Sequence, residues 1–373
     1  YIMGSTLNTD HPLVNHLIFS AKNRYGVPVE LVTTDLESSL VHKVDKAHFI
    51  KSYYHFVKAV NYYLISSELQ NQMFINDRSL DYDDYRKNLL AEDFDELFEK
   101  SGVCCIDELV QFATSYNNQM NAVLVFSEKE ISSNLSFELF NLAIITGKLG
   151  KTAQGIVALK EKNNSQGVID MGGCHKVAPG FQMYSDPSVI KKLEDKWGVS
   201  LPEYGASSYK LLIGNKLRNI FIFGEDPLGC AINKQEVEKW FTTVDFLMVQ
   251  DYFLTETARK ADLVLPASLP LETGGSFTNT QKHILNFDKQ IESVIEKSSP
   301  QQLIDLMAQF GLNGISDLES ALSELFTLLP EPVNPETRKY TLHYTGHDNF
   351  NRMFNHGCDI VNKRFDEEFE KAF

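Results

Sequence analysis

The stretch FLMVQDYFLTETARKADLVLP, residues 246–266, decides the fold. An apolar run at 246–249 gives way to the polar turn Gln250-Asp251, Thr255 can begin a short helix, and a second apolar run follows at 263–265. This succession of strand, turn, helix and strand is typical of a βαβ unit, whose two strands pair in parallel. We therefore expect a parallel α/β sheet in this part of the chain.

Similar strands recur along the chain. Runs of β-branched or aromatic residues, most of them followed by a small or polar turn and then by a helical pattern, occur at 1–3, 29–32, 122–126 and 219–223. Crossovers of this kind predict parallel sheets that are covered on both faces. After the first run, Asp10 is expected to cap a helix that continues through Asn23. Leu13, Leu17 and Ile18 should then point inward.

The composition favours a folded protein of more than one domain. At 373 residues the chain is long enough for about two or three domains. It has 35 Lys and Arg against 50 Asp and Glu, a formal net charge of -15 at pH 7, so its field should repel the phosphates of nucleic acids. Its uncharged apolar runs fall short of the roughly 20 residues that a membrane helix needs. We expect neither nucleic-acid binding nor direct membrane insertion.

The cysteines indicate a reducing compartment. The chain has five of them, an odd number, and no C-x-x-C pair. This argues against a disulfide framework and against a cysteine-rich zinc or iron-sulfur site, so we predict no metal ligands and a cytoplasmic location. Tyr1 stands inside an expected strand, so we also expect the chain to be a piece of a longer polypeptide.

The candidate binding residues follow the expected strands. Neither G-x-G-x-x-G nor G-x-x-x-x-G-K-[ST] occurs. The turns at the strand ends are Gly4-Ser5-Thr6, Thr33-Thr34-Asp35, Gly224-Glu225-Asp226-Pro227 and Gln250-Asp251. In open α/β sheets such turns face the ligand crevice, where backbone N–H groups can bind phosphates and a carboxylate can accept from ribose hydroxyls. Equally, these residue types are those of ordinary turns.

A polar, glycine-rich stretch at 155–181 is too irregular for a core element, and we expect a structured functional loop there. Its amide side chains suit a flat heterocycle, because they present paired donors and acceptors. Lys160 could offer a positive charge to an anion, although a single lysine is more often a surface residue. Cys174-His175 invites a metal interpretation, but a structural role is favoured without further ligands.

In order and spacing, these motifs resemble the molybdopterin oxidoreductases, most closely formate dehydrogenase alpha subunits and the related large iron-sulfur subunit of complex I. The resemblance covers most of residues 1–312 and rests on Gly4-Ser5 with Asp10-His11-Pro12, Asn164-x-Gln166-Gly167 with Asp170-Met171-Gly172, Gly224-x-x-Pro227, and the segments 250–258 and 261–266. It implies that relatives bind two pterin-guanine dinucleotides around molybdenum or tungsten.

The resemblance also implies the architecture. We expect an α/β fold of two Rossmann-like, doubly wound domains with mostly parallel sheets, without the family's C-terminal barrel. The first would span 1–150, with an acidic helical insertion around 81–117. The second would span 151–329, with the pterin-loop-like segment 155–181, and a Pro-rich break would begin a C-terminal tail at 330–373.

The turns and the resemblance together give one set of cofactor-binding candidates: Gly4, Ser5, Thr6, Asp35, Asn164, Gln166, Gly167, Asp170, Gly224, Glu225, Asp226, Gln250, Asp251, Thr255, Thr257 and Asn279. Lys160 is the catalytic candidate on the condition that the site is active. Formate-oxidising relatives carry an Arg at this position, and Lys does not replace the bidentate recognition of a carboxylate by Arg.

Departures from the family cluster at ligand-facing positions. Thr33-Thr34-Asp35 stands where active relatives carry Asp-Pro-Arg, and Tyr53-Tyr54-His55 stands where they carry a Gly-Thr-Asp that holds a guanine. The carboxylate that would pair with the guanine edge is thereby lost, and two tyrosines would partly fill its space. The run 278–283 likewise departs from the usual Asn-x-Glu-Arg-Arg. A scaffold that has shed its cofactor would show this pattern.

We therefore favour a molybdopterin-oxidoreductase-fold subunit of an NADH dehydrogenase-type or formate dehydrogenase-type electron-transfer complex, with a degenerate cofactor site and a structural role. Its partners would be iron-sulfur and flavin/NADH subunits. Two alternatives remain open: a portion of an active molybdenum or tungsten formate dehydrogenase that oxidises formate to CO2, and a nucleotide-binding regulatory module. The active enzyme predicts bound molybdopterin guanine dinucleotide, and the favoured interpretation predicts no cofactor in this chain. The regulator predicts a free nucleotide near Gly4–Thr6 and Asp251.

Overall fold

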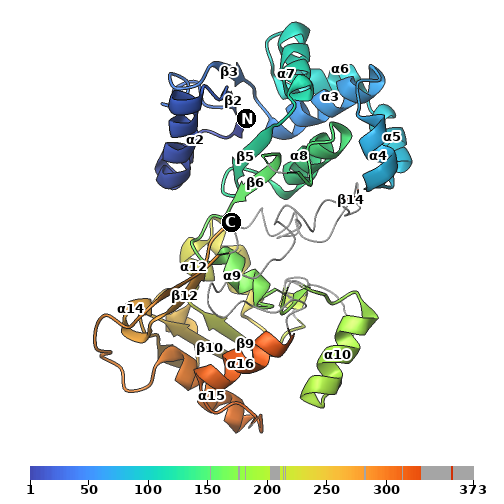
Figure 1. Ribbon diagram of the computed structural model, residues 1–373. Coiled ribbons are helices and arrows are strands. Elements are labelled where there is room, and N and C mark those ends of the chain that lie inside the picture. Colours follow the sequence, from blue (N-terminus) through green and yellow to red (C-terminus); the bar gives the residue numbers. More distant parts are fainter. Residues whose placement is uncertain are drawn as a thin grey trace. The chain divides into compact units, whose positions relative to one another are not determined.

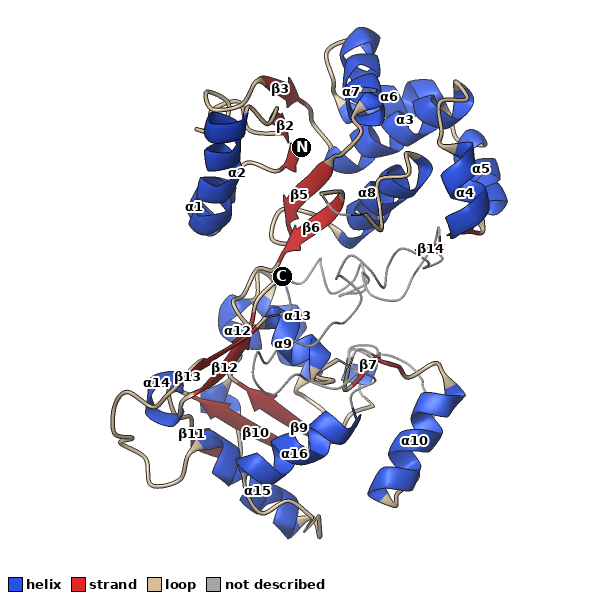
Figure 2. Cartoon of the chain, viewed as in Figure 1, coloured by secondary structure: helices blue, strands red, loops and turns tan. Residues whose placement is uncertain are grey.

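The structure, a computed structural model, describes residues 1–328 apart from 152, 175–176, 181, 202–210, 213, 215, 281–282 and 313, and it also describes 354–355. The chain divides into two compact units, with the division between Ser165 and Gln166. The first unit is coloured blue to green in Figure 1, and the second runs from green to red. Each unit has a parallel sheet of its own (Figure 2).

A five-stranded parallel sheet forms the centre of the first unit. Its strands are β1 (Ile2–Met3), β2 (Glu30–Thr33), β3 (Lys46–Phe49), β5 (Val123–Ser127) and β6 (Gly155–Leu159), in the order β3-β2-β1-β5-β6. A doubly wound sheet with this order has its switch point between β1 and β5. The ligand crevice of such a sheet lies at the carboxyl ends of those strands.

Alternate side chains of the strands pack on opposite faces of this sheet. One face is covered by α2 (Pro12–Tyr25) and is lined by Ile2, Leu31 and Val125. The other face is covered by α3 (Tyr53–Ser66), α7 (Ile106–Asn118) and α8 (Ser133–Ile145) and is lined by Met3, Val32 and Phe126 (Figure 1). Because both faces are buried, β1, β5 and β6 are apolar almost without interruption, whereas β3 at the edge of the sheet carries Lys46 and His48.

Helices fill the long crossover between β3 and β5. Between α3 and α7 lie α4 (Gln72–Arg78), α5 (Tyr82–Leu90) and α6 (Phe94–Ser101). The short β4 (Ser79–Leu80) follows α4 and pairs in parallel with β14 (Phe354–Asn355). The first-turn acids of α5 and α6 are exposed, as expected of a solvated helix face: Asp83, Asp84, Asp95 and Glu96.

The second unit is built on a three-stranded parallel sheet. Its strands are β9 (Asn219–Phe223), β10 (Phe246–Asp251) and β11 (Leu263–Pro266), with β10 in the middle. Two antiparallel hairpins are β7 (Val177–Ala178) with β8 (Gln182–Met183) and β12 (Gly275–Thr278) with β13 (Ile284–Phe287). The helices are α9 (Ser165–Asp170, at the division), α10 (Pro187–Trp197), α12 (Pro227–Cys230), α13 (Lys234–Trp240), η1 (Ala258–Lys260), α14 (Pro270–Thr273), α15 (Ser299–Gln309) and α16 (Leu318–Leu328).

The predicted α/β class with mostly parallel sheets is confirmed. Strands are present at every run of residues for which the sequence predicts one. The predicted tail at 330–373 lies outside the described residues except for 354–355. Within the part of the chain that the structure describes, no helix combines the length and the apolar character needed to cross a bilayer.

The helix expected after the first strand differs from the prediction. The chain forms a short α1 (Leu7–Asp10) and then α2, which begins at Pro12, so Asp10 ends one helix instead of capping the next. Pro12 is favoured at the first position of a helix, and this start sets which side of α2 faces the sheet. Leu13 and Leu17 are 79% and 64% exposed, whereas Ile18 packs on the sheet.

The segment 155–181 is more regular than predicted. Its first residues form β6, which pairs with β5 along its whole length, and 165–170 form α9. The apolar run Gly155-Ile156-Val157-Ala158-Leu159 supplies a core strand, so the prediction of an irregular loop from 155 was wrong at this end.

Candidate functional site

A carboxylate of the chain itself fills the turn after β1. Glu130, in the turn after β5, reaches Gly4-Ser5-Thr6 at the switch point of the sheet. Both carboxylate oxygens of Glu130 accept from Ser5 N, at 2.9 and 2.8 Å, and Oε1 also accepts from Ser5 Oγ at 2.5 Å. Thr6 N donates to Oε2 at 3.4 Å. These N–H groups are the donors with which such a turn would bind a phosphate.

Gly4 permits this close approach. Its φ is +134°, a conformation that L side chains rarely adopt. A Cβ at this position would lie 2.1 Å from Glu130 Oε2. The Glu130 carboxylate can therefore occupy this position only because residue 4 has no side chain.

Further polar contacts surround this turn. Asp10 accepts from Thr6 Oγ1 at 2.7 Å and pairs with Lys129 at 3.2 Å. The hydrogen bond from Thr6, together with Lys129, lowers the pKa of Asp10, so this carboxyl group is ionised at neutral pH. His11 Nε2 lies 3.1 Å from Ser127 Oγ, and burial lowers the pKa of His11. The edge between β1 and β5 thus satisfies its own polar groups.

The turn after β2 is closed by Tyr53. The Tyr53 hydroxyl accepts from Thr34 N at 3.2 Å. Asp35 N donates to Thr33 Oγ1 at 3.1 Å, and the exposed Asp35 carboxylate accepts from Glu37 N at 2.9 Å. Burial raises the pKa of Tyr53, so it remains a neutral phenol.

Tyr54 and His55 line a small hollow. Its volume is about 190 Å³, and its other lining residues are Glu92, Asp93, Glu96, Leu97 and Lys100. Lys58 Nζ donates to the Tyr54 hydroxyl at 2.9 Å, and Ser52 Oγ lies 2.8 Å from His55 Nδ1. Pockets for small molecules usually exceed about 300 Å³, so this hollow is small for a heterocyclic ligand.

Lys160 is paired with an acid of its own unit. It follows β6, and its ammonium group contacts Glu128 Oε1 in the turn after β5. The two side chains are 19% and 20% exposed. The positive charge that sequence analysis assigns to an anion is therefore neutralised by a largely buried carboxylate.

Most of the predicted pterin-loop residues lie on α9. Gln166 and Asp170 are buried, and Gln166 Nε2 donates to Asp170 Oδ1 at 2.8 Å. Gly180 N donates to the backbone oxygen of Asp170 at 2.7 Å. Gly167 is buried in the same helix, and Asn164 immediately precedes it. The side-chain bond lies within α9, and the backbone oxygen of Asp170 connects the helix to Gly180.

Asp226 joins two turns at the carboxyl edge of the second sheet. Its Oδ1 accepts from Thr257 Oγ1 at 2.6 Å, from Thr257 N at 2.9 Å and from Gly229 N at 3.0 Å, and Glu256 N donates to Oδ2 at 3.3 Å. Thr257 Oγ1 also accepts from Leu228 N at 3.0 Å. Burial raises the pKa of Asp226, but these hydrogen bonds outweigh it and the net shift is downward.

Gln250 and Asp251 end β10 beside this turn. Gln250 is buried, and its Nε2 donates to Gln302 Oε1 on α15 at 2.9 Å. Asp251 Oδ1 accepts from Phe253 N at 3.2 Å. The Gln250 side chain thus connects β10 to α15, and the Asp251 side chain stabilises the turn that follows β10.

The remaining candidates also lie on turns. Gly224 and Glu225 are exposed after β9, and Thr255 Oγ1 accepts from Ala258 N at 3.1 Å. Asn279 lies on the β12–β13 hairpin, where its Oδ1 accepts from His283 N at 3.0 Å. This hairpin is separate from the parallel sheet.

The structure brings Ser5 and Thr6 together with Glu130, and Asp226 together with Thr257. Sequence analysis missed Glu130. The available signal was the strand at 122–126, because its following turn, Ser127-Glu128-Lys129-Glu130, must reach the same sheet edge as Gly4–Thr6.

Comparisons with known proteins indicate the family. Residues 119–304 match the family described as "Molybdopterin oxidoreductase". A putative formate dehydrogenase of Staphylococcus haemolyticus is 32% identical over 67% of this chain and 26% of its own length. The alpha subunits of formate dehydrogenases 2 and 1 of Methanococcus maripaludis are 29% and 28% identical, over 87% and 93% of this chain and 49% and 51% of their own lengths.

Acetylene hydratase from Pelobacter acetylenicus has a similar fold, with a TM-score of 0.65 at 14% sequence identity over 92% of this chain and 52% of that one. A protein with these parallel sheets and crevice turns is of the doubly wound α/β class. The chain belongs to the molybdopterin oxidoreductase family and is similar to formate dehydrogenase alpha subunits. It spans between about a quarter and a half of the length of these curated relatives.

Proposed function

We propose that this chain is a subunit of a cytoplasmic electron-transfer complex of the NADH dehydrogenase or formate dehydrogenase type, in which it has a degenerate cofactor site and a structural role. The observation that carries the proposal is the carboxylate of Glu130 in the turn after β1. A subunit that holds partners together needs the fold and its surfaces, and it does not need an open crevice.

The family implies a molybdopterin cofactor with molybdenum or tungsten. The turn after β1 does not fit the phosphate of such a group as it stands, because Ser5 and Thr6 already donate to Glu130. A phosphate would also meet the like charge of this carboxylate at close range. We derive no chemical step through the cofactor in this unit.

Two other features support the proposal. Thr34 N, a further donor at the sheet edge, donates to the Tyr53 hydroxyl. In the second unit, Asp226 accepts its hydrogen bonds from the adjacent turn. The polar groups at both sheet edges thus stabilise the fold.

The relatives support a redox complex. Two of them are named as formate dehydrogenase alpha subunits, a name that indicates further subunits. For this chain we propose iron-sulfur and flavin/NADH subunits as partners. Where relatives bind a pterin, we propose that the form is the guanine dinucleotide.

The names of the relatives also favour a second candidate, a portion of an active formate dehydrogenase. In that case Lys160 would have to leave Glu128 to meet the formate carboxylate. Removal of the Lys160 charge should therefore abolish formate oxidation in an active formate dehydrogenase and should leave the activity of the complex intact if this chain is structural.

The test uses the complex purified from its native host with Lys160→Ala in this chain. We expect the complex to assemble and its redox turnover to survive. Lys162→Ala is the matched control, because this lysine is 74% exposed and contacts its neighbour Glu161. Loss of formate oxidation in Lys160→Ala alone, with assembly intact, would establish the active enzyme and overturn the structural role.

A further inference from the structure

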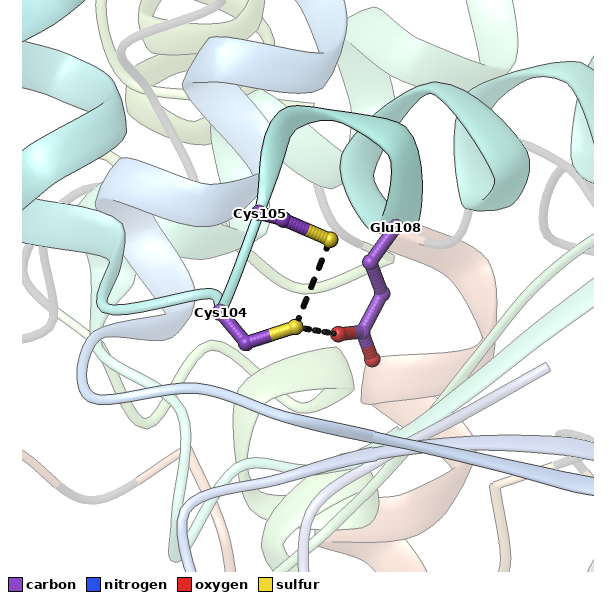
Figure 3. Close-up of side chains that lie close together, drawn as sticks. All are labelled: Cys104, Cys105 and Glu108. Carbon is purple, nitrogen blue, oxygen red and sulfur yellow. Dashed lines mark hydrogen bonds between the residues drawn. The ribbon is translucent and has the colours of Figure 1, made fainter.

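Two adjacent cysteines and a glutamate converge at the start of α7. Cys105 is the N-cap residue, in extended conformation, and its side chain makes no capping hydrogen bond. Glu108 lies in the first turn of α7, and its backbone N–H donates to Cys105 O at 3.2 Å. Figure 3 shows the two thiols and the carboxylate turned toward one another.

The geometry is close to that of a metal site. Cys104 Sγ lies 3.5 Å from Cys105 Sγ and 2.8 Å from Glu108 Oε2, and the three ligand atoms lie within 4.8 Å of one another. Two sulfurs on one tetrahedral zinc ion stand about 3.8 Å apart, given Zn–S bonds of about 2.3 Å. Small movements of exposed side chains would therefore admit an ion.

The buried His48 contacts the Glu108 carboxylate on the side away from the thiols. His48, on β3, is fully buried, and within the described residues its Nδ1 has no hydrogen-bond partner. This nitrogen faces Glu108 Oε1 at 3.4 Å, while Nε2 lies 3.0 Å from Glu30 Oε2. The His48 ring also packs edge-on against Phe112 of α7, with centroids 5.3 Å apart. One Glu108 oxygen thus faces the interior and the other faces the thiols.

Metal-binding carboxylates are commonly oriented by such an outer contact. The buried His48 ring holds Glu108 Oε1 toward the interior, so Oε2 already faces the two sulfurs. The Glu108 side chain does not have to change its rotamer to bind an ion. The contact between His48 and Glu108 distinguishes this cluster from a chance group of exposed side chains. Because Glu108 is already ordered, it loses less conformational entropy when it binds an ion.

We propose that Cys104, Cys105 and Glu108 bind one thiophilic divalent cation of the zinc class, with two thiolates and one carboxylate oxygen as ligands. Both thiol protons leave to solvent, and the Cys104 S–H hydrogen bond to Glu108 is replaced by bonds to the ion. Because both cysteines are exposed, the fourth position is open to water. The prediction of no metal ligands rested on the missing C-x-x-C pair and on the odd number of cysteines. Neither criterion detects a site made by two adjacent cysteines.

A reactive redox pair is the competing interpretation of neighbouring thiols. The hydrogen bond to the Glu108 carboxylate raises the pKa of the Cys104 thiol to about 12, so this thiol is protonated at neutral pH. The thiolate is the species that attacks a disulfide, and Cys104 supplies little of it without a metal ion. Closing the pair to a disulfide would also need an oxidant.

The test is a Cd²⁺ titration of the reduced, purified full chain in a non-thiol reductant, followed by thiolate-to-metal charge-transfer absorption. We expect one ion per chain, and protection of Cys104 and Cys105 from alkylation as read by mass spectrometry. Cys104→Ser, Cys105→Ser and Glu108→Gln should each weaken binding at least about tenfold. Cys230→Ser is the matched control, because Cys230 is also a free, exposed cysteine and should not matter.

Three results would overturn the proposal: no charge-transfer absorption in the wild-type chain, equal binding by Cys104→Ser, or metal protection of Cys230 instead of the pair. All three substitutions replace side chains at the start of a helix, and thermal unfolding of each variant checks that the unit still folds.

Discussion

The carboxylate of Glu130 accepts two hydrogen bonds from the backbone N–H of Ser5, at 2.9 and 2.8 Å, although 125 residues separate the two in the sequence. The turn after β1 and the turn after β5 meet at the switch point of the first sheet, where a doubly wound fold binds an anionic ligand. Here the anion is a side chain. We propose that this carboxylate takes the place of a phosphate at the turn while the strands remain intact.

Gly4→Ala should destabilise the first unit strongly. The residue has a φ of +134°, and the new Cβ would lie 2.1 Å from Glu130 Oε2. We expect a loss of roughly 2 kcal/mol or more in the free energy of unfolding, measured by urea denaturation. Gly26→Ala is the matched control, since Gly26 has a φ of +65° and open space around it, and should lose only about 1 kcal/mol. Equal losses would contradict the contact with Glu130.

Glu130→Ala should open the turn to an added anion. Ser5 N and Thr6 N lose their acceptor, so pyrophosphate can take its place. We expect pyrophosphate to raise the melting temperature of this variant and to leave that of the wild type unchanged. Glu37→Ala removes an exposed carboxylate from a neighbouring turn and should not respond. A response of the wild type as large as that of Glu130→Ala would show that Glu130 does not block the turn.

Asp226→Asn should make the second unit less stable at neutral pH. Hydrogen bonds from Thr257 and two other backbone N–H groups lower the pKa of Asp226. A carboxyl group whose folded pKa is depressed contributes stability above its unfolded pKa of about 3.9, and this contribution is lost as the pH falls through the folded value. We expect a loss of about 1 to 3 kcal/mol at pH 7 that shrinks toward pH 3.

The comparison needs urea unfolding of both proteins across this pH range. Asp245→Asn provides a control, because Asp245 is an exposed acid of the same unit that pairs with exposed Arg218. A difference between wild type and Asp226→Asn that is constant with pH would show that the ionised carboxylate is not what joins the two turns.

Zinc should stabilise the first unit through Cys104, Cys105 and Glu108. An ion that binds the folded state alone, at about one hundred times its Kd, adds about 2.7 kcal/mol, which for a unit of this size corresponds to a rise of roughly 5 to 10 °C in melting temperature. A chelator should reverse the rise, and Cys105→Ser should abolish it. A rise that persists in Cys105→Ser would assign the effect to another site.

Several strands could be predicted from the sequence because they are short apolar runs that are buried on both faces, as in β5 and β10. The side of α2 that faces the sheet could not be predicted from the sequence. Asp10 has the chemistry of a cap, but Pro12 starts the helix, and Leu13 is exposed as a result. Local signals of similar strength compete at a helix start, and tertiary packing decides between them.

For the candidate site, the positions of the turns could be predicted from the sequence, but the residues that contact them could not. The turns Gly4–Thr6 and Gly224–Asp226 lie at the sheet edges, because strand ends can be read from the local pattern. What fills them could not be read in this way. Glu130 reaches the turn Gly4–Thr6 from another segment, and Tyr53 reaches the turn after β2 in the same way. Contacts of this kind depend on strand order, which no local pattern encodes.

The most direct test of the degenerate site is the metal and pterin content of the longest native form of this protein. Elemental analysis would measure molybdenum, tungsten and iron, and fluorescence after oxidation would measure pterin. We expect a well-folded sample without molybdenum, tungsten or pterin bound by this chain. One mole of molybdenum or tungsten with two of pterin per chain would contradict the structural role and would direct attention to Lys160 and formate turnover.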